Sequence, residues 1–184
     1  GDVGALSSYL ARAVPNELKF LIEDAIISGN GIGKPQGILH AAALFTMTPR
    51  DNASHVTYTD IVNMWAHRFV SYKDYVWLVN SSVLPEISIV TLTNSYAPPR
   101  YIDFGPDGVL RMMGRPVIEM EQCPMLGNGG DILLVSPSQY QTIDKGGVES
   151  ASSIHVNFVN DETAYRFTYR IDGVLIATID ASTN

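Results

Sequence analysis

The stretch EDAIISGNGIGKPQGIL, Glu23–Leu39, decides the fold, because a long helix ends within it and a glycine-rich loop follows. Upstream, from residue 3 to residue 28, apolar residues recur every three or four positions and so share one helical face. They are Leu6, Leu10, Val14, Leu18, Leu21, Ile22, Ala25 and Ile26. Pro15 lies in the middle, where it should kink the helix or begin a second one. A long helix with one apolar face needs a flat surface to lie across.

The loop Gly29–Gly37 has the composition of a phosphate-binding loop but not its spacing. That motif requires a glycine, four residues, Gly-Lys and then Ser or Thr. Ser28 stands in place of the first glycine, and Pro35 stands where the hydroxyl belongs. The dinucleotide-binding motif also fails, because the loop follows a helix where that motif follows a strand. We interpret the loop as a tight turn that needs several positive φ angles.

The middle of the chain predicts alternating helices and strands. Thr59 is the expected cap of a helix that runs to about Phe69, and Tyr75–Val79 reads as a buried strand. Ser81 or Ser82 should cap a third helix through Leu92, with Pro85 in its first turn. The next expected elements are an irregular excursion over Tyr96–Asp107, a strand pair over Leu110–Glu121 turning at Gly114-Arg115-Pro116, a buried strand over Asp131–Val135, and a short helix from Ser136 to about Thr142.

The last third has the clearest strand signal. Four apolar residues alternate with polar ones at a period of two: Tyr165, Phe167, Tyr169 and Ile171. Asp172-Gly173 is a turn signal, and Val174–Ile179 should follow as a strand. The aromatic residues could form a stacking platform for single-stranded nucleic acid. In an acidic chain we favour a core or subunit-facing side of a sheet.

Composition describes a globular protein. The 184 residues are 46% hydrophobic and 17% charged, which suits one large domain or two small ones. The net charge is −7, and the twelve basic residues include no run of three, which argues against specific nucleic-acid binding. We also expect no membrane association, since no apolar run approaches the roughly 20 residues that span a bilayer.

Motifs for catalysis or metal binding are absent from the sequence. The single Cys123 excludes an internal disulfide, and we expect it to be small and partly buried. Glu119 and Glu121 would share one face of a strand, where we interpret them as exposed acids and not as a catalytic pair. The histidines lack the short spacings that chelate metals: His40, His55, His67 and His155. We therefore expect no catalytic, metal or cofactor-binding residues, although a site assembled from distant residues stays open.

Four stretches, taken in order, resemble the major capsid proteins of tailed bacteriophages, the Hong Kong 97 fold family. The first is Glu23–Leu39, with an acidic pair, an apolar stretch and a Gly-Asn-Gly-x-Gly-x-Pro-x-Gly-Ile loop. The second is WLVN, Trp77–Asn80, before a serine-capped helix. The third is MGRPVIEMEQCP, Met113–Pro124, similar to the family's Gly-x-Pro-Val hairpin and acidic-x-x-Pro ending. The fourth runs from Asp131 through Asp144-Lys145-Gly146-Gly147 to Arg170-Ile171-Asp172-Gly173.

The resemblance implies an α+β Hong Kong 97-like fold with two domains. Residues 1–45 would supply the spine helix and glycine-rich loop of a peripheral domain, and residues 137–184 would return to it as β-strands. Residues 46–136 would form an axial domain, a mixed sheet flanked by helices. The implied function is structural: the chain would self-assemble into pentamers and hexamers of an icosahedral phage head that encloses double-stranded DNA. Its partners would be copies of itself, with scaffold, maturation protease and portal proteins, in the host cytoplasm during assembly and then in the virion.

Members of this family carry an N-terminal arm and an extended loop, the E-loop, before the spine helix. This sequence starts at or inside that helix. Because the arm and the loop reach over neighbouring subunits, we expect a truncated or proteolysed form that assembles poorly.

Three alternatives stay open beside the phage shell. An encapsulin, a bacterial nanocompartment shell, resembles the same fold, and bound cargo enzyme would distinguish it. A small hydrolase or transferase would show a pocket with strongly shifted pKa values, and a monomeric binding module would show one large apolar patch. For a shell we expect heterologous contacts, at Asn52–Thr59 and Tyr96–Asp107 around capsomer axes and at Asn157–Glu162 between capsomers.

Overall fold

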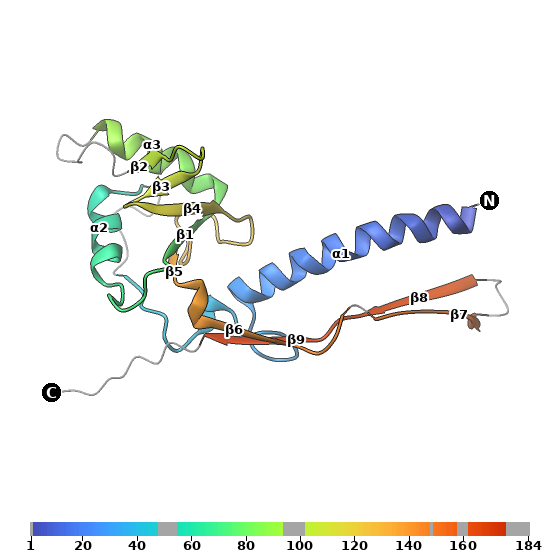
Figure 1. Cartoon of the computed structure of the whole chain (residues 1–184). Coiled ribbons are helices and arrows are strands. Elements are labelled where there is room, and N and C mark those ends of the chain that lie inside the picture. The colour runs from blue at the N-terminus through green and yellow to red at the C-terminus, as the bar shows by residue number, and fades with distance from the viewer. Residues whose placement is uncertain (1, 48–54, 94–101, 148, 158–161, 176–184) are drawn as a thin grey trace. The chain divides into compact units, whose positions relative to one another are not determined.

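The structure is a computed structural model that describes residues 2–47, 55–93, 102–147, 149–157 and 162–175 (Figure 1). The chain divides into two units, and the first is built from two separate parts of the sequence. Unit 1 comprises residues 1–41 and 141–175, and unit 2 comprises residues 42–140 with residues 176–184. Each unit is described by itself below.

Helix α1, Asp2–Ser28, is the first element of unit 1 and confirms the predicted long helix. Pro15 lies inside it without ending it. The helix is about 40 Å long at 1.5 Å per residue. Several residues of the predicted apolar face are half-buried, namely Leu10, Val14, Leu18 and Ile22. Residues 4–9 are all exposed, so the N-terminal end of α1 has little cover from its own chain.

The glycine-rich loop folds back onto the end of α1. The Gly29 amide donates to the Ala25 carbonyl at 2.9 Å, and the Gly37 amide donates to the Gly29 carbonyl at 2.7 Å. An antiparallel bridge pairs Asn30 with Gln36. Gly31 and Gly33 have φ angles of 75° and 68°. The predicted turn with positive φ angles is confirmed at these two positions.

The other two glycines of the loop, Gly29 and Gly37, lie where any side chain would collide with the backbone. A Cβ atom on Gly29 would lie 2.1 Å from the Pro35 carbonyl oxygen, and one on Gly37 would lie 2.6 Å from the Ile27 carbonyl oxygen. Around them the buried residues of this corner are Ala25, Ile27, Pro35 and Ile38. The 3₁₀ turn η1, Ile38–His40, follows. The family-like motif is therefore a closely packed corner of backbone.

The strands of unit 1 form two small pairs, of which β7–β8 is antiparallel. Strand β6, Tyr140–Asp144, neighbours β9, Ile171–Leu175. Strands β7, Glu149–Asn157, and β8, Glu162–Thr168, form a long hairpin with a register irregularity between Ser153 and Asn157. The period-two prediction of a strand from Tyr165 to Asp172 is confirmed by β8 as far as Thr168, but the strand breaks at residues 169–170 and β9 begins at Ile171. The side chains of Tyr165 and Phe167 lie outside the described part of the chain, so the predicted role of these aromatic residues stays untested.

The predicted turn at Asp172-Gly173 is wrong, because both residues lie within β9. Gly173 is buried, and its carbonyl accepts a hydrogen bond of 2.9 Å from the Gln36 amide of the glycine-rich loop. The glycine thus permits a close approach of two backbones, which is the other common use of a glycine in a strand. The predicted strand over Val174–Ile179 is matched by β9 as far as Leu175, and the rest lies outside the described residues.

Unit 2 contains a mixed five-stranded sheet with the order β2-β3-β4-β1-β5. Its strands are β1 Val76–Val79, β2 Ile102–Phe104, β3 Leu110–Met112, β4 Arg115–Glu119 and β5 Ile132–Val135. Strand β1 runs parallel to β4 and antiparallel to β5, and the other pairs are antiparallel. The predicted strands at β1, β3, β4 and β5 are confirmed.

Two details of the sheet correct the sequence prediction. The excursion over Tyr96–Asp107 contains β2, because Ile102 pairs with Met112 across the sheet and this pairing overrides the local Pro and Gly content. The β3–β4 turn lies one residue earlier than predicted, at Met113-Gly114, which have φ angles of 52° and 73°. Two consecutive positive φ angles are typical of a type I′ hairpin turn.

The helices of unit 2 begin at caps other than those predicted. Helix α2, Tyr58–Ala66, is capped by Thr57 and not by Thr59, because Thr57 and Asp60 form a reciprocal capping box. Before helix α3, Leu84–Thr93, the 3₁₀ turn η2, Ser81–Val83, is capped by Asn80, whose side chain accepts from the Ser82 amide at 3.0 Å. The predicted short helix after Ser136 is only a 3₁₀ turn, η3 Pro137–Gln139, and β6 follows at once.

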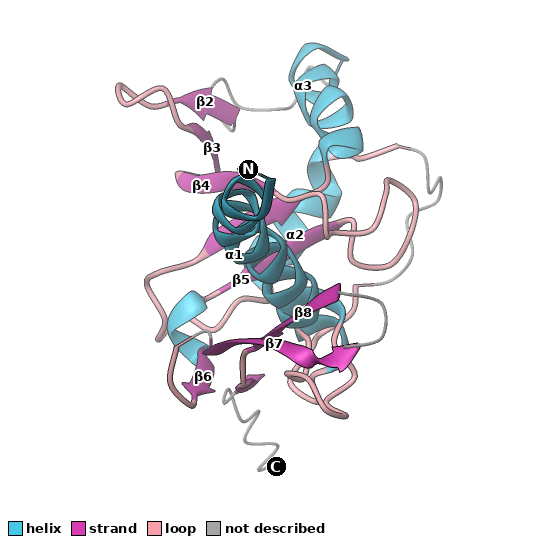
Figure 2. Ribbon diagram, turned by 90° about the vertical axis from the view of Figure 1, so that its right-hand side faces the viewer, coloured by secondary structure: helices cyan, strands magenta, loops and turns pink. Residues whose placement is uncertain are grey.

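The core of unit 2 lies where α2 and α3 pack against the sheet (Figure 2). Trp77 of β1 is fully buried, and its indole Nε1 donates to the Met112 carbonyl at 2.9 Å. The buried cluster comprises Val56, Ile61, Trp77, Val79, Val83, Ile87, Met112, Val117 and Ile132. Together, the helices and the mixed sheet confirm the predicted α+β class.

Candidate assembly surfaces

Within the part of the chain that the structure describes, Cys123, the two glutamates and the histidines do not come together in a site. Cys123 is only 2% exposed, and burial raises the pKa of its thiol to about 11. Its interpretation as a small buried residue is confirmed. Glu119 ends β4 and Glu121 lies beyond the strand, so these two exposed acids do not share a strand face as predicted.

Three of the four histidines have described side chains, and these lie apart from one another. His55 contacts Glu86 at 3.0 Å, and His67 lies 2.8 Å from the Asn63 carbonyl and stacks on Phe45. His40 is exposed at the end of η1. Over the residues that the structure describes, no three His, Cys, Asp or Glu side chains gather in a metal-binding arrangement.

In unit 2, Asn80 organises the loop between β4 and β5. Its amide Nδ2 donates to the Cys123 carbonyl at 2.8 Å, and its Oδ1 accepts from the Ser82 hydroxyl at 2.8 Å. The same hydroxyl accepts from the Leu126 amide at 2.9 Å. These bonds hold the loop in one conformation while the Met125 side chain stays 70% exposed. The loop therefore exposes the apolar side chain of Met125 while hydrogen bonds hold its backbone to Asn80 and Ser82.

A second polar link in unit 2 joins Asp74 to the start of η3. The Asp74 carboxylate accepts a short hydrogen bond from the Ser136 hydroxyl and a 2.9 Å bond from the Ser138 amide. These two bonds, the hydroxyl first, lower the pKa of Asp74 to about 2. An aspartate from a distant part of the sequence therefore caps this turn.

In unit 1, the glycine-rich loop presents Ile32 at its tip. Ile32 stands between the two positive-φ glycines, and its side chain is 80% exposed. Its amide donates to the Asn30 side-chain oxygen at 3.1 Å, which fixes the tip. A large apolar side chain held outward by a tightly packed loop is available for contact with a partner's surface. The sequence signal was Gly-Ile-Gly, which predicted the turn but not the exposure of its isoleucine.

Helix α1 adds a second apolar surface in unit 1. Four large apolar residues on the helix are at least 40% exposed: Leu6, Tyr9, Phe20 and Leu21. An open, mainly apolar groove of about 530 Å³ lies between α1 and the turn after β6. Its lining includes Pro15, Leu18, Ile22 and Tyr169. Helix α1 is therefore only partly covered by the described residues of its own unit.

The surfaces predicted from the sequence are described only in part. Within Tyr96–Asp107, Phe104 on the edge strand β2 is 71% exposed, and Asp107 pairs with Arg111 at 2.8 Å. From Asn52–Thr59 the described residues are 55–59, which include the α2 cap. The turn between Asn157 and Glu162 lies outside the described residues.

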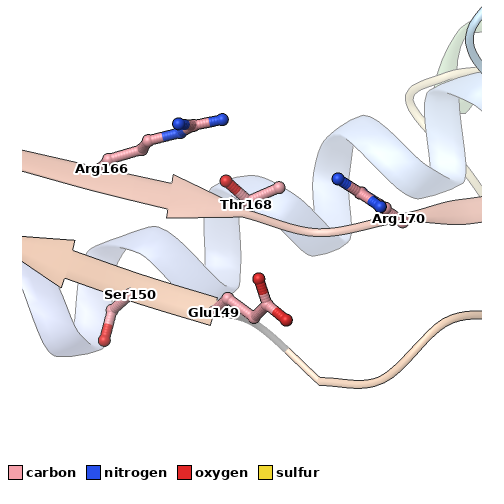
Figure 3. A pocket seen from close by; sticks show the side chains of 5 residues that line it. All are labelled: Glu149, Ser150, Arg166, Thr168 and Arg170. Carbon is pink, nitrogen blue, oxygen red and sulfur yellow. The ribbon is translucent and has the colours of Figure 1, made fainter.

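An open polar cavity of about 460 Å³ lies along the β7–β8 hairpin, lined by Glu149, Ser150, Arg166, Thr168 and Arg170. Figure 3 shows Arg166 and Arg170 on the same side of the chain, leaning toward each other with Thr168 between them. Ser150 points to the other side. The sequence showed both arginines alternating with apolar residues, but not that they line one cavity.

No helix in the described part of the chain combines the length and the apolar character required to cross a membrane.

Comparison with solved structures identifies the fold. The chain resembles the capsid of an empty GTA particle with a TM-score of 0.71 and 17% sequence identity, over 92% of this chain and 62% of that one. It resembles the capsid of a native GTA particle with a TM-score of 0.67 and 16% identity, over 91% of this chain and 61% of that one. The chain thus spans less than two thirds of the length of these capsid chains. No curated protein matches it.

The fold is therefore that of capsid shell proteins, an α+β class in which helices and a mixed sheet build a shell-forming subunit. The family model for the phage capsid family matches residues 1–179. The chain belongs to the phage capsid family. The resemblance noted in the sequence is confirmed.

Proposed function

We propose that this chain is the shell-forming part of a major capsid protein that assembles into pentamers and hexamers of an icosahedral phage head around double-stranded DNA. The observation that carries the proposal is the family match over residues 1–179, nearly the whole chain. The role is structural, and we propose no catalytic step for it.

The exposed apolar residues of unit 1 support assembly as the function. A helix is stabilised in water mainly by the packing of its apolar face, and residues 4–9 of α1 have almost none within their own chain. Ile32 and Tyr9 are 80% and 64% exposed. A neighbouring copy that covered these residues would remove about 25 cal/mol of unfavourable hydration per Å² of apolar surface.

We assign the two units to the two domains of a capsid subunit. Unit 1, with the long helix and the two strand pairs, corresponds to the peripheral domain. Unit 2, with the mixed sheet and its two helices, corresponds to the axial domain that faces the capsomer axes. The exposed tip at Met125 and the edge strand with Phe104 are then the parts of unit 2 available for contacts around an axis.

The partners that follow from this function are first of all other copies of the chain. Scaffold, maturation protease and portal proteins are the further partners of such a shell, with assembly in the host cytoplasm and the mature protein in the virion. These partners are proposals that follow from the family.

Particle size tests the function directly. The complete gene product and this 184-residue chain should be compared by light scattering and negative-stain microscopy. We expect closed shells on the order of tens of nanometres from the complete product and smaller species from the chain alone. Nucleic acid inside the shells supports a phage head, whereas a protein cargo would indicate an encapsulin. A complete product that stays monomeric, with scaffold and protease supplied, contradicts a shell function.

A further inference from the structure

The β7–β8 hairpin carries a polar groove that the fold itself leaves unused. In the hairpin register Glu149 lies opposite Thr168, and Arg166 lies opposite Ala151. Residues directly opposite each other share a face of the sheet, and so do residues two apart along a strand. Arg166, Thr168 and Glu149 therefore share one face, and Arg170 continues it beyond the end of β8. All four line the cavity of about 460 Å³.

Both arginines are exposed, and neither has an ion-pair partner within the described part of the chain. Four residues of extended chain span at most about 14 Å, and Figure 3 shows the two side chains leaning toward each other over Thr168. A guanidinium presents a planar fork of donors that matches the two oxygens of a carboxylate or a phosphate. The groove is therefore built for an oxyanion.

The charge pattern favours a carboxylate of a protein over the phosphates of a nucleic acid. Glu149 lines the same groove, and a nearby carboxylate repels a chain of phosphates. A protein surface can meet such a mixed pattern with an acid for each arginine and a donor for the glutamate. The chain itself is a rich source of acids, with 19 acidic and 12 basic residues.

We propose that the groove of Glu149, Arg166, Thr168 and Arg170 binds an acidic segment of a second copy of this chain. The proposal rests on the proposed shell function and adds to it a specific polar contact. The groove and its acidic partner are different surfaces, as a heterologous contact that joins subunits head to tail around an axis requires.

Charge reversal tests the contact. The double variant Arg166→Glu/Arg170→Glu in the complete gene product should keep the thermal unfolding midpoint of the wild type. It should lower shell formation, followed by light scattering, by about tenfold or more, because two charge-assisted pairs become like-charge contacts. The matched control is Lys73→Glu, a charge reversal at an exposed residue of unit 2, which is set beside the single groove reversal Arg166→Glu. Wild-type yields from the groove variant, or an equal loss from the control, would overturn the proposal.

Chemical capture identifies what occupies the groove. The variant Arg166→Lys keeps the charge and supplies an amine that a carbodiimide couples to a carboxylate in contact with it. Shells assembled from a mixture of ¹⁵N-labelled and unlabelled chains should give crosslinks from residue 166 to an Asp or Glu of the other isotopic form. Crosslinks confined to one chain contradict a contact between copies.

A DNA-binding experiment tests whether the groove binds the phosphates of a nucleic acid instead of a carboxylate. A fluorescein-labelled duplex oligonucleotide is titrated with the wild type and with the charge-reversal variant. Equal, weak anisotropy changes support the protein contact, whereas binding that the reversal abolishes assigns the groove to phosphates and overturns the proposal. If wild-type shells form normally but the reversal has no effect, only the groove contact fails. If the wild type forms no shells, the proposed function fails as well.

Discussion

At the residue scale, Gly29 and Gly37 set the distance between the end of α1 and the loop that returns to it. Gly37 has φ −71° and ψ 155°, which any residue can adopt. The requirement for glycine there is therefore steric, since a Cβ would lie 2.5 Å from the Gly29 nitrogen. The positive φ angles of Gly31 and Gly33 are a separate, conformational requirement.

We expect Gly37→Ala to lower the free energy of unfolding by about 1–3 kcal/mol, the usual range for overpacking a closely packed site. Urea unfolding followed by circular dichroism measures it. Gly147→Ala is the matched control in the same unit, because a Cβ there meets nothing within 4 Å. Equal stability of the two variants would show that the loop relaxes around the extra methyl group.

Asp74 gives unit 2 a specific dependence on pH. Its pKa is about 2 in the folded chain against an ordinary value of 3.8, so the folded state favours the carboxylate. Its stabilising effect is fully present above pH 3.8 and is lost as the pH falls from there toward 2.

We expect Asp74→Asn to be less stable than the wild type at neutral pH, with the difference shrinking between pH 3.8 and about 2. Other carboxylates titrate in both proteins, so the difference between the two denaturation curves isolates Asp74. Ser136→Ala removes the main cause of the low pKa of Asp74. It should therefore narrow the pH range over which the stability depends on the Asp74 carboxylate. A stability difference that stays constant through this pH range would contradict the assignment.

At the element scale, the start of α2 shows how a cap is chosen. Thr57 and Asp60 satisfy each other's backbone groups, with the Thr57 amide donating to Asp60 at 2.8 Å. Thr59 was the predicted cap, but it lies inside the helix and is exposed. A capping box needs an acceptor at the third helical position, and Asp60 is the residue that meets this need for Thr57.

We expect Thr57→Ala to lower the free energy of unfolding by about 1 kcal/mol through loss of the cap. Thr59→Ala should leave it unchanged or raise it by a few tenths of a kcal/mol, since alanine is the better helix former. Chemical denaturation of both variants under one condition compares them. A larger loss of unfolding free energy from Thr59→Ala than from Thr57→Ala would show that Thr59 is the cap, as the sequence predicted.

Elements with a strong local pattern were predictable from the sequence, and elements made by distant pairing were not. The periodicity of α1 and the apolar run of β1 were sufficient to predict both. Strand β2 depends on its pairing with β3, and the role of Gly173 depends on Gln36, far away in the chain. Local composition carries no information about such partners, so the first was predicted as an excursion and the second as a turn.

The candidate surfaces were less predictable than the fold, for a related reason. Exposure belongs to the folded chain: Ile32 and Ile27 are both isoleucines near the end of α1, yet one is 80% exposed and the other is fully buried. The groove of Arg166 and Arg170 likewise required the hairpin register that places Glu149 beside them. The family resemblance supplied the function, but not the residues that carry it.

At the scale of the whole molecule, we expect Ile32 to contribute to assembly and not to the stability of the folded chain. We expect Ile32→Asp to keep the unfolding free energy within about 0.5 kcal/mol of the wild type, since the side chain is exposed. Shell formation by the complete gene product should fall about tenfold or more, because a carboxylate would be buried in a contact made for an apolar side chain. Light scattering and urea unfolding give the two quantities.

The conservative variant Ile32→Val is the control, and it should assemble like the wild type. Full assembly of Ile32→Asp would exclude the loop tip from the subunit contacts.

The two-part make-up of unit 1 has a consequence for how the protein is made. The described residues of unit 2 all lie between residues 42 and 140, whereas unit 1 needs residues 1–41 together with residues 141–175. On the ribosome, α1 emerges before residues 42–140, and the carbonyl of Gly173 that accepts from Gln36 is translated only after them. Because translation adds about 5–20 residues per second, the apolar side of α1 stays uncovered for several seconds or longer before the strands of unit 1 are made. A chain that ends at residue 140 and has left the ribosome should therefore show a protease-resistant unit 2 and a protease-sensitive α1.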